Sequence, residues 1–284
     1  MTQVIHFQTS LQDYFTKFSE LASYFAQSAT RRSELEALID QYAAFITKEE
    51  NKEIWEREAS DMPPHSNSLA LELRRKSGQC VAMMEKLRAW KLISGAAEKA
   101  NYFHEIESCI EDEFGLFNIN EASKVLLIGS GAFPMTPLLI ARRTGAHVTG
   151  IDIDEEAIML GQEVIRRLGP DLGIRLERVP AHQLETIGEM THIIFSSTVE
   201  EKYDILDQLH RWTHPDVIVF MRYGDQLKSL FNYPSQEVDS QKWKRMDNRK
   251  AYPDQIFDVA IYEKAQQHQT LQKEGSSCVH PNES

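Results

Sequence analysis

Two glycines and a pair of acids stand at a spacing that can bind a nucleoside. Gly129 and Gly131 follow the apolar run Val125–Ile128, and Asp152 and Asp154 close the next apolar run about twenty residues later. A Gly-x-Gly turn lets a ligand approach the backbone, and the helix that follows offers free N–H groups. An acid at the end of the next strand accepts hydrogen bonds from ribose hydroxyls. The pattern predicts a nucleoside site at the carboxyl edge of a parallel sheet.

The rest of the glycine loop indicates which nucleoside. A third glycine is missing, and Phe133-Pro134 stands where a pyrophosphate would need close backbone approach. We therefore expect a nucleoside without phosphates, with S-adenosylmethionine as the first candidate. NAD and a tight turn with no ligand are the alternatives, while Asp152 disfavours the 2′-phosphate of NADP. Ser130, Pro134 and Thr136 complete the loop and the start of its helix as expected cofactor contacts.

Two further segments are expected at the same edge of the sheet. Ala181 and His182 follow the third predicted strand, where adenine would lie, although a solvated loop histidine explains His182 equally well. Ser196 follows the fourth strand and would face the methionine portion, and a hydroxyl at a strand end is also a common helix cap. An ordinary methyltransferase carries an acid two residues before the first glycine, and here that position is Leu127. The nucleoside signal is therefore stronger than the methyl-transfer signal.

The elements that position these residues change character near residue 120. Apolar residues recur at three- and four-residue steps in 8–60, 69–97 and 101–117, which predicts helices, with a break at the prolines of 61–67. From Lys124 onward short apolar strands alternate with helices, and the last two strands, 243–246 and 256–264, are expected to be antiparallel. The predicted fold is α/β: a doubly wound, Rossmann-like sheet (residues 121–265) preceded by an all-helical domain (residues 1–120). Residues 266–284 are polar and predict a disordered tail.

Composition excludes several classes of protein. The net charge of −12 without a basic stripe argues against nucleic acid as a partner. We find neither a run of apolar residues long enough to span a membrane nor a signal segment, so the expected location is cytoplasmic. Three cysteines without a Cys-x-x-Cys pair predict neither a disulfide framework nor a zinc site. His210 and His214 have metal-ligand spacing, but Pro215 follows at once, and no protein metal site is expected.

Several motifs, taken in order, resemble those of nicotianamine synthases. Gly129-Ser-Gly-Ala-Phe-Pro-Met-Thr136 is similar to their Gly-Ser-Gly-Pro-Leu-Pro-Leu-Thr loop, and Asp152-Ile-Asp154 to their Asp-Ile-Asp element. Met221-Arg-Tyr-Gly224 with Phe231-Asn-Tyr-Pro234 resembles their Leu-Arg-Ser-Ala and Phe-Leu-Tyr-Pro. Ser77-Gly78 with Glu85, and Asn101-Tyr-Phe103, resemble two further segments of that family. The resemblance covers roughly residues 70–265, and the short chain is most similar to the bacterial branch that makes opine metallophores of the staphylopine type.

That resemblance implies a reaction. The branch transfers one 3-amino-3-carboxypropyl (2-aminobutanoyl) unit from S-adenosylmethionine to histidine and releases methylthioadenosine, and a partner opine dehydrogenase then uses the product. The protein selects among the three carbons on the sulfonium by orientation, with no metal required. The acceptor is D- or L-histidine, since the two differ only in placement. The alternatives are a small-molecule methyltransferase, a nicotianamine synthase proper and a non-catalytic nucleoside-binding regulator.

The acceptor amine must lose a proton before it attacks, because amino-acid amines are mostly protonated at pH 7. By resemblance and by chemistry, the expected base is Glu85 or Tyr102 from the helical half, although an exposed glutamate and a core tyrosine are commonplace. Arg222 is expected to bind a substrate carboxylate, or else to pair with Asp225. Tyr223 and Tyr233 are the other expected substrate contacts. The apolar helices of 10–45 fit a homodimer face or ordinary core packing.

Overall fold

The computed structural model describes residues 2–24, 30–58, 64–95, 118–246 and 255–265. The helix predicted at 101–117 and the tail predicted at 266–284 lie outside these ranges. The predicted domain boundary near residue 120 lies just after the undescribed residues 96–117.

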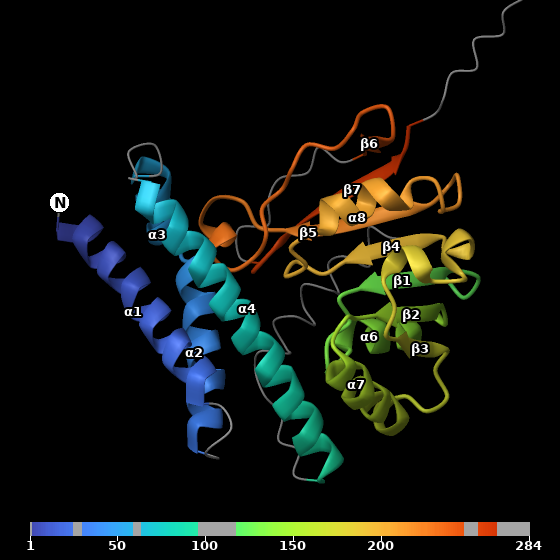
Figure 1. The fold of residues 1–284 in the computed structure, drawn as a ribbon, viewed down its shortest axis with the longest axis horizontal. Coiled ribbons are helices and arrows are strands. Elements are labelled where there is room, and N and C mark those ends of the chain that lie inside the picture. The colour runs from blue at the N-terminus through green and yellow to red at the C-terminus, as the bar shows by residue number, and fades with distance from the viewer. Residues whose placement is uncertain (1, 25–29, 59–63, 96–117, 247–254, 266–284) are drawn as a thin grey trace, which may run out of the picture.

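Among the described residues, four helices form the N-terminal part of the fold: α1 (Thr2–Tyr24), α2 (Thr30–Thr47), α3 (Glu49–Glu58) and α4 (Pro64–Ile93). They pack against one another as a bundle beside the sheet, with α4 nearest to it (Figure 1). The apolar residues that repeat at helical spacing are buried inside this single chain, among them Leu11, Phe18, Leu35, Ile39 and Tyr42. Core packing therefore accounts for the pattern in residues 10–45.

The start of α4 differs from the prediction. The helix begins at Pro64, whereas the sequence predicts a break through residue 67 and a helix from Leu69. Proline is well tolerated in the first turn of a helix, because its missing N–H would have no intrahelical partner there. The break is therefore shorter than the prolines suggest.

In the part of the chain that the structure describes, the sheet contains seven strands: β1 (Lys124–Ile128), β2 (His147–Ile151), β3 (Ile174–Glu177), β4 (His192–Phe195), β5 (Ile218–Tyr223), β6 (Trp243–Arg245) and β7 (Asp258–Lys264). Their order is β3-β2-β1-β4-β5-β7-β6. β1 to β5 are parallel, and β7 and β6 add to β5 as an antiparallel pair. The predicted doubly wound fold is confirmed. Its strand order reverses between β1 and β4, where ligands bind in open sheets of this kind.

Side chains alternate between the two faces of the sheet along each strand. Both faces carry apolar side chains, and helices cover both of them. Leu126 and Ile128 of β1 join a cluster with helix α8 (Lys202–Leu209). Val125 and Leu127 face the other way and join a cluster that includes α6 (Met135–Thr144) and the N-terminal bundle. Helix α7 (Glu155–Leu168) packs beside α6, and three 3₁₀ turns, η1 (Ala181–Gln183), η2 (Ile187–Glu189) and η3 (Gln226–Leu230), lie in the connections.

The bundle and the sheet share one hydrophobic core. Tyr42 of α2 packs edge-on against Phe231, with ring centroids 5.6 Å apart, and its hydroxyl donates to the Leu230 carbonyl at 2.9 Å. This contact sets the bundle over the carboxyl edge of the sheet, where the predicted site lies. No helix within the described ranges is long and apolar enough to cross a membrane.

Candidate active site at the carboxyl edge of the sheet

The glycine loop has the geometry that the sequence predicts. Gly129 and Gly131 take positive φ angles of 83° and 66°, which side chains rarely adopt. The backbone N–H groups of Gly129 and Ser130 donate to the Ile151 carbonyl of β2. Ser130 is 6% exposed, and its hydroxyl has no hydrogen-bond partner in the described part of the chain. A buried, unsatisfied hydroxyl on a glycine loop suits a polar ligand, and S-adenosylmethionine fits this requirement.

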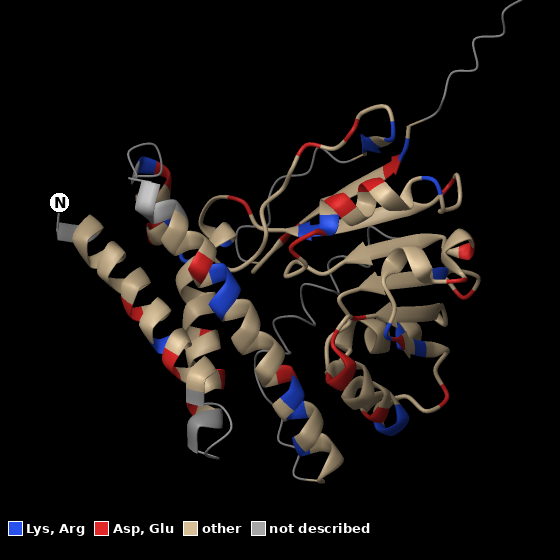
Figure 2. Ribbon diagram, viewed as in Figure 1, with Lys and Arg blue, Asp and Glu red and all other residues tan. Residues whose placement is uncertain are grey.

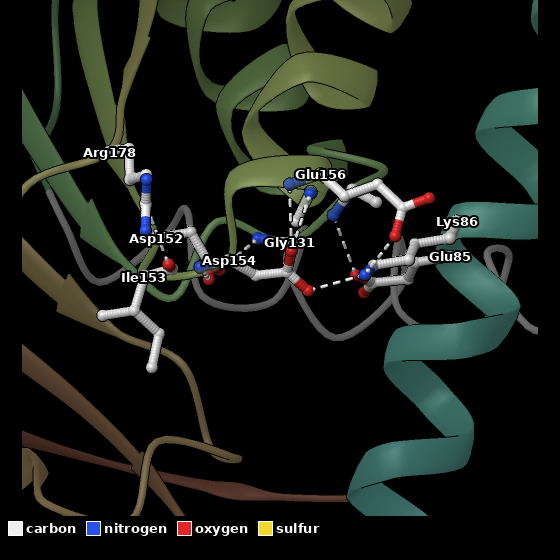
Figure 3. Close-up of polar contacts among 10 residues, drawn as sticks. Glu85, Lys86, Gly131, Asp152, Ile153, Asp154, Glu156 and Arg178 are labelled. Carbon is white, nitrogen blue, oxygen red and sulfur yellow. Dashed lines mark hydrogen bonds and ion pairs between the residues drawn. The ribbon is translucent and has the colours of Figure 1, made fainter. Parts of the chain in front are cut away.

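The two acids that follow β2 have different surroundings. Asp152 accepts from the Gly131 N–H at 2.9 Å and from the Asp154 N–H at 3.0 Å, so its carboxylate is fixed beside the glycine loop. Asp154 is the N-cap of α7 and accepts from the N–H groups of Glu156 and Ala157. Lys86 of α4 lies 2.7 Å from both Asp154 and Glu156 and lowers the pKa of Asp154 (Figure 3). Asp152 thus suits a ribose, whereas Asp154 caps a helix and holds α4.

Glu85 reaches from α4 onto the glycine loop (Figure 3). It accepts from the Ala132 N–H at 3.3 Å, and its carboxylate lies against the Cα of Gly131. Burial raises the pKa of Glu85 to about 8, and the nearby charge of Asp152 adds to the rise, while the Ala132 N–H and Arg88 oppose it. A carboxylate with a pKa near the working pH is suited to accept and release a proton.

A cavity of about 90 Å³ lies between α4 and the carboxyl edge of the sheet. Predicted site residues from α4, α6, β5 and the loops after β1 and β4 line it: Glu85, Gly129, Ser130, Thr136, Ser196 and Arg222. Ser197 and Thr198, which were predicted to lie with Ser196 at this edge, also line it. The described residues that complete its wall and were not predicted are Val81, Leu127, Phe133, Met135, Phe231, Asn232, Ile256 and Phe257. A base, a nucleoside-type loop and a guanidinium therefore share one cavity.

Arg222 and Tyr223 are separated by the alternation of strand β5. Arg222 is 5% exposed, donates to the Thr136 hydroxyl at 3.1 Å and lies over the Phe257 ring, 5.1 Å from its centroid. Tyr223 packs in the cluster on the opposite face, where its hydroxyl accepts from Arg245 at 3.3 Å. Neighbouring strand residues point to opposite faces, so only one of the two can reach the cavity. Tyr223 is therefore not part of the wall that the described residues form, and its role as a substrate contact stays a prediction.

Tyr233 lies at the interface between the helical bundle and the sheet. Its hydroxyl donates to Glu200 at 2.9 Å, Glu200 also pairs with Arg75 of α4 at 3.2 Å, and Arg74 lies over the Tyr233 ring. Tyr233 thus ties the loops of the sheet to α4 and does not belong to the cavity wall formed by the described residues. The alternative partner of Arg222, Asp225, accepts two hydrogen bonds from Ser235.

The remaining predicted residues fall at the same edge. Ala181 is buried and His182 is exposed in η1, where the His182 ring lies 3.3 Å from the Gln183 amide. Ser196 follows β4, and its hydroxyl lies 3.3 Å from that of Thr198. Pro134 immediately precedes α6. Tyr102 lies outside the described residues, so its predicted role as the second candidate base stays a prediction.

One exposed apolar side chain at this edge was missed. Ile153, between the two acids, is 84% exposed and points away from Glu85 (Figure 3). A large apolar side chain in water beside the acid predicted to bind a ribose offers a surface for a purine ring. Its position in Asp-Ile-Asp could have predicted this exposure. The strand ends at Ile151, so the Ile153 side chain no longer packs against the sheet.

A larger hollow, of about 580 Å³, lies along the edge strand β6. Two of its cations already have partners, since Lys244 pairs with Glu263 at 3.2 Å and Arg245 donates to Tyr223. On the side of the predicted site, Lys86 of α4 pairs with Asp154 and Glu156 at the start of α7, and Figure 2 shows basic residues of α4 opposite acidic residues of α7. Within the described ranges, no group of three or more His, Cys, Asp and Glu side chains could hold a metal ion.

Gly131→Ala should abolish most activity while leaving the fold largely intact. A Cβ at this position would overlap the Glu85 carboxylate, and the positive φ adds about 1–2 kcal/mol of strain. We expect a loss of S-adenosylmethionine affinity in calorimetry and a loss of turnover. Gly78→Ala on α4 is the matched control, because a Cβ there meets nothing within 4 Å. Equal activity of the two variants would contradict the placement of Glu85.

Known proteins resemble both the sequence and the fold. The family model described as a methyltransferase domain matches residues 119–275. An L-histidine 2-aminobutanoyltransferase of Pseudomonas aeruginosa (strain UCBPP-PA14) is 29% identical over 227 residues, which cover 80% of this chain and 85% of that protein. A Yersinia pestis protein of the same name is 29% identical over 198 residues, covering 68% and 71% of the two chains.

The solved structures extend the similarity to the helical part. MtNAS in complex with MTA and tNA has a TM-score of 0.74 at 15% identity, covering 91% of this chain and 98% of its own. A point mutant of MtNAS in complex with S-adenosylmethionine has a TM-score of 0.68 at 16% identity, covering 89% and 98%. These relatives confirm the predicted resemblance to the nicotianamine synthase-like group. Because the methyltransferase-domain model matches more than half of its residues, the chain belongs to the methyltransferase-domain family.

Proposed function

We propose that this protein transfers the 3-amino-3-carboxypropyl group of S-adenosylmethionine to the α-amine of histidine and releases methylthioadenosine. The observation that carries the proposal is Glu85, held over the glycine loop with its pKa raised to about 8. A base at this position suits an acceptor amine, which must lose a proton before or as it attacks. The relatives named L-histidine 2-aminobutanoyltransferase support histidine as the acceptor.

Different residues bind S-adenosylmethionine, bind the acceptor and accept the proton. The glycine loop, Ser130 and Asp152 bind and orient the nucleoside part of S-adenosylmethionine, whose sulfonium makes the neighbouring carbon electrophilic. Arg222, fixed by Thr136 and Phe257, binds the acceptor carboxylate. Glu85 accepts the proton of the acceptor amine as that amine attacks. The reaction thus depends on placing three groups around one cavity and on a single proton transfer.

Three statements stay predictions alongside this function. Tyr102 is a second candidate for the base, a dehydrogenase that consumes the product follows from the resemblance, and a cytoplasmic location follows from the composition.

Chromatography of the reaction products tests the proposal. Reactions contain S-adenosylmethionine with no acceptor, with L-histidine or with D-histidine. We expect methylthioadenosine with one enantiomer and none without an acceptor, which would also assign the stereochemistry. S-adenosylhomocysteine would indicate a methyltransferase, which the name of the domain family favours. Methylthioadenosine without any histidine would indicate a nicotianamine synthase proper, and binding without turnover a nucleoside-binding regulator.

A further inference from the structure

Lys202, the first residue of α8, has a fully buried side chain, with 0% of its surface exposed. Its ammonium donates to three backbone carbonyls: Ser197 at 3.2 Å, Arg222 at 2.7 Å and Tyr233 at 3.0 Å. A lysine ammonium has three protons, so each proton has one acceptor. The three carbonyls belong to three different segments at the carboxyl edge of the sheet.

These three segments form or adjoin the end of the cavity that contains Arg222, the residue proposed to bind the acceptor carboxylate. Ser197 follows β4 and lines the cavity, and Arg222 lies on β5 and lines it too. Tyr233 ends a segment, residues 229–233, that crosses from the sheet to the bundle. Within the same network the Tyr233 N–H donates to the Ser197 carbonyl, and the Gly224 N–H donates to the Tyr233 carbonyl, both at 3.1 Å. Lys202 is the donor that the three segments share.

The 229–233 segment is also held from the bundle. Arg74 donates to the Ser229 carbonyl at 2.6 Å, and Tyr42 donates to the Leu230 carbonyl at 2.9 Å. The segment is therefore fixed at one end by helices α2 and α4 and at the other by Lys202. Loss of the Lys202 contact would loosen the end at Tyr233, which would keep its backbone hydrogen bonds to Ser197 and Gly224.

A buried cation carries a cost that an apolar side chain of the same length would avoid. Burial and the positive charge of Arg74 lower the pKa of Lys202 to about 7, and the negative charge of Asp225 opposes them. Removing the ammonium would take one donor from each of the three carbonyls, while the Ser197 and Tyr233 carbonyls would keep the N–H donors of Tyr233 and Gly224. The buried ammonium of Lys202 therefore holds the carbonyls of Ser197, Arg222 and Tyr233 in place.

We propose that Lys202 is a positioning residue for the acceptor site: by binding three carbonyls it fixes the end of β5, and with it the Arg222 guanidinium, against the 229–233 segment. The inference rests on the proposed function, because it assigns Arg222 to the acceptor carboxylate. Asp152 and the glycine loop lie on the β1–β2 side, and their hydrogen bonds to one another and to β2 do not involve Lys202.

Lys202→Met and Lys202→Gln test this inference in the full-length protein. Met keeps the length of the side chain without donors, and Gln restores a donor amide. For Lys202→Met we expect kcat/KM for histidine to fall about 10²-fold, mostly through a higher KM, with S-adenosylmethionine affinity in calorimetry unchanged. Lys202→Gln should recover part of that loss. Lys242→Met, which removes an exposed lysine paired with Asp207 at 2.6 Å, is the control and should match the wild type.

Each other outcome has a definite meaning. Unchanged histidine kinetics in folded Lys202→Met would overturn the inference, and so would equal losses for histidine and S-adenosylmethionine. If neither variant folds, as judged by circular dichroism, Lys202 serves the stability of the fold and the positioning role is rejected. A wild type that releases no methylthioadenosine with either histidine would overturn the proposed function, and the inference with it.

Discussion

Glu85→Gln should lower kcat for the transfer by about 10²–10⁴-fold while S-adenosylmethionine still binds. Glutamine keeps an oxygen that can accept from the Ala132 N–H, so the loop should be preserved, but it cannot take the proton from the acceptor amine. Rapid-quench assays of methylthioadenosine with saturating histidine measure the loss. Glu53→Gln on α3 is a matched control, because Glu53 is exposed and lies outside the site. A loss of less than tenfold in Glu85→Gln would mean that another group, such as Tyr102, is the base.

The same variant should be more stable than the wild type near pH 8. The folded pKa of Glu85 is about 8, and an unfolded glutamate titrates near 4.3. The folded state therefore favours the protonated form, and the stability that this form contributes is fully present below about pH 4 and lost as the pH rises to about 8. Gln avoids this loss, so we expect its advantage in unfolding free energy to grow from near zero at pH 4 to on the order of 2–4 kcal/mol at pH 8. A constant difference across this range would contradict the raised pKa.

Lys228→Met should destabilise the protein by about 3–5 kcal/mol, because it removes the cation of a buried ion pair and leaves the charge of the Asp258 carboxylate in the interior. Lys228 of η3 and Asp258 of β7 lie 2.7 Å apart, with side chains 7% and 6% exposed. They join the segment that carries Phe231 to the strand that follows Phe257, so the cavity wall depends on this ion pair. Urea denaturation measures the loss.

The double variant Lys228→Met/Asp258→Leu separates two causes of the loss of stability: the lost attraction between the two charges, and the cost of keeping the Asp258 charge in the interior. We expect it to recover most of the stability that the single variant loses, because two apolar side chains remove both buried charges. Lys242→Met breaks an exposed ion pair with Asp207 and should cost less than about 1 kcal/mol. A single variant as mild as Lys242→Met would show that the buried pair contributes little.

The sheet and its glycine loop could be predicted from sequence because their signals are local. An apolar run ending in Gly-x-Gly, with an acid closing the next run, is contained in about thirty residues. The alternation along β5 was also available and would have shown that Arg222 and Tyr223 cannot both face one cavity. The cap formed by Asp154 could have been inferred in the same way, since an acid directly before an apolar helical run is a common N-cap.

Other parts of the site carry no local signal. Asn232 reaches the cavity from the residues after η3, and Ile256 and Phe257 reach it from the residues just before β7. Lys202 looks like a solvated residue at the start of a helix, and only the meeting of β4, β5 and the 229–233 segment buries it. Glu85 was found through the resemblance, whereas its raised pKa depends on burial against a loop far away in the sequence. These features arise from contacts over long sequence separations.

The most direct test of the account follows which carbon of S-adenosylmethionine moves. Two samples are incubated with the protein and the histidine enantiomer that supports turnover, one labelled in the S-methyl group and one in the aminocarboxypropyl chain. We expect the chain label on histidine and the methyl label in the nucleoside product, each followed by mass spectrometry. A methyl label on histidine, with the chain label left in the nucleoside product, would contradict the proposed transfer and make the protein a methyltransferase.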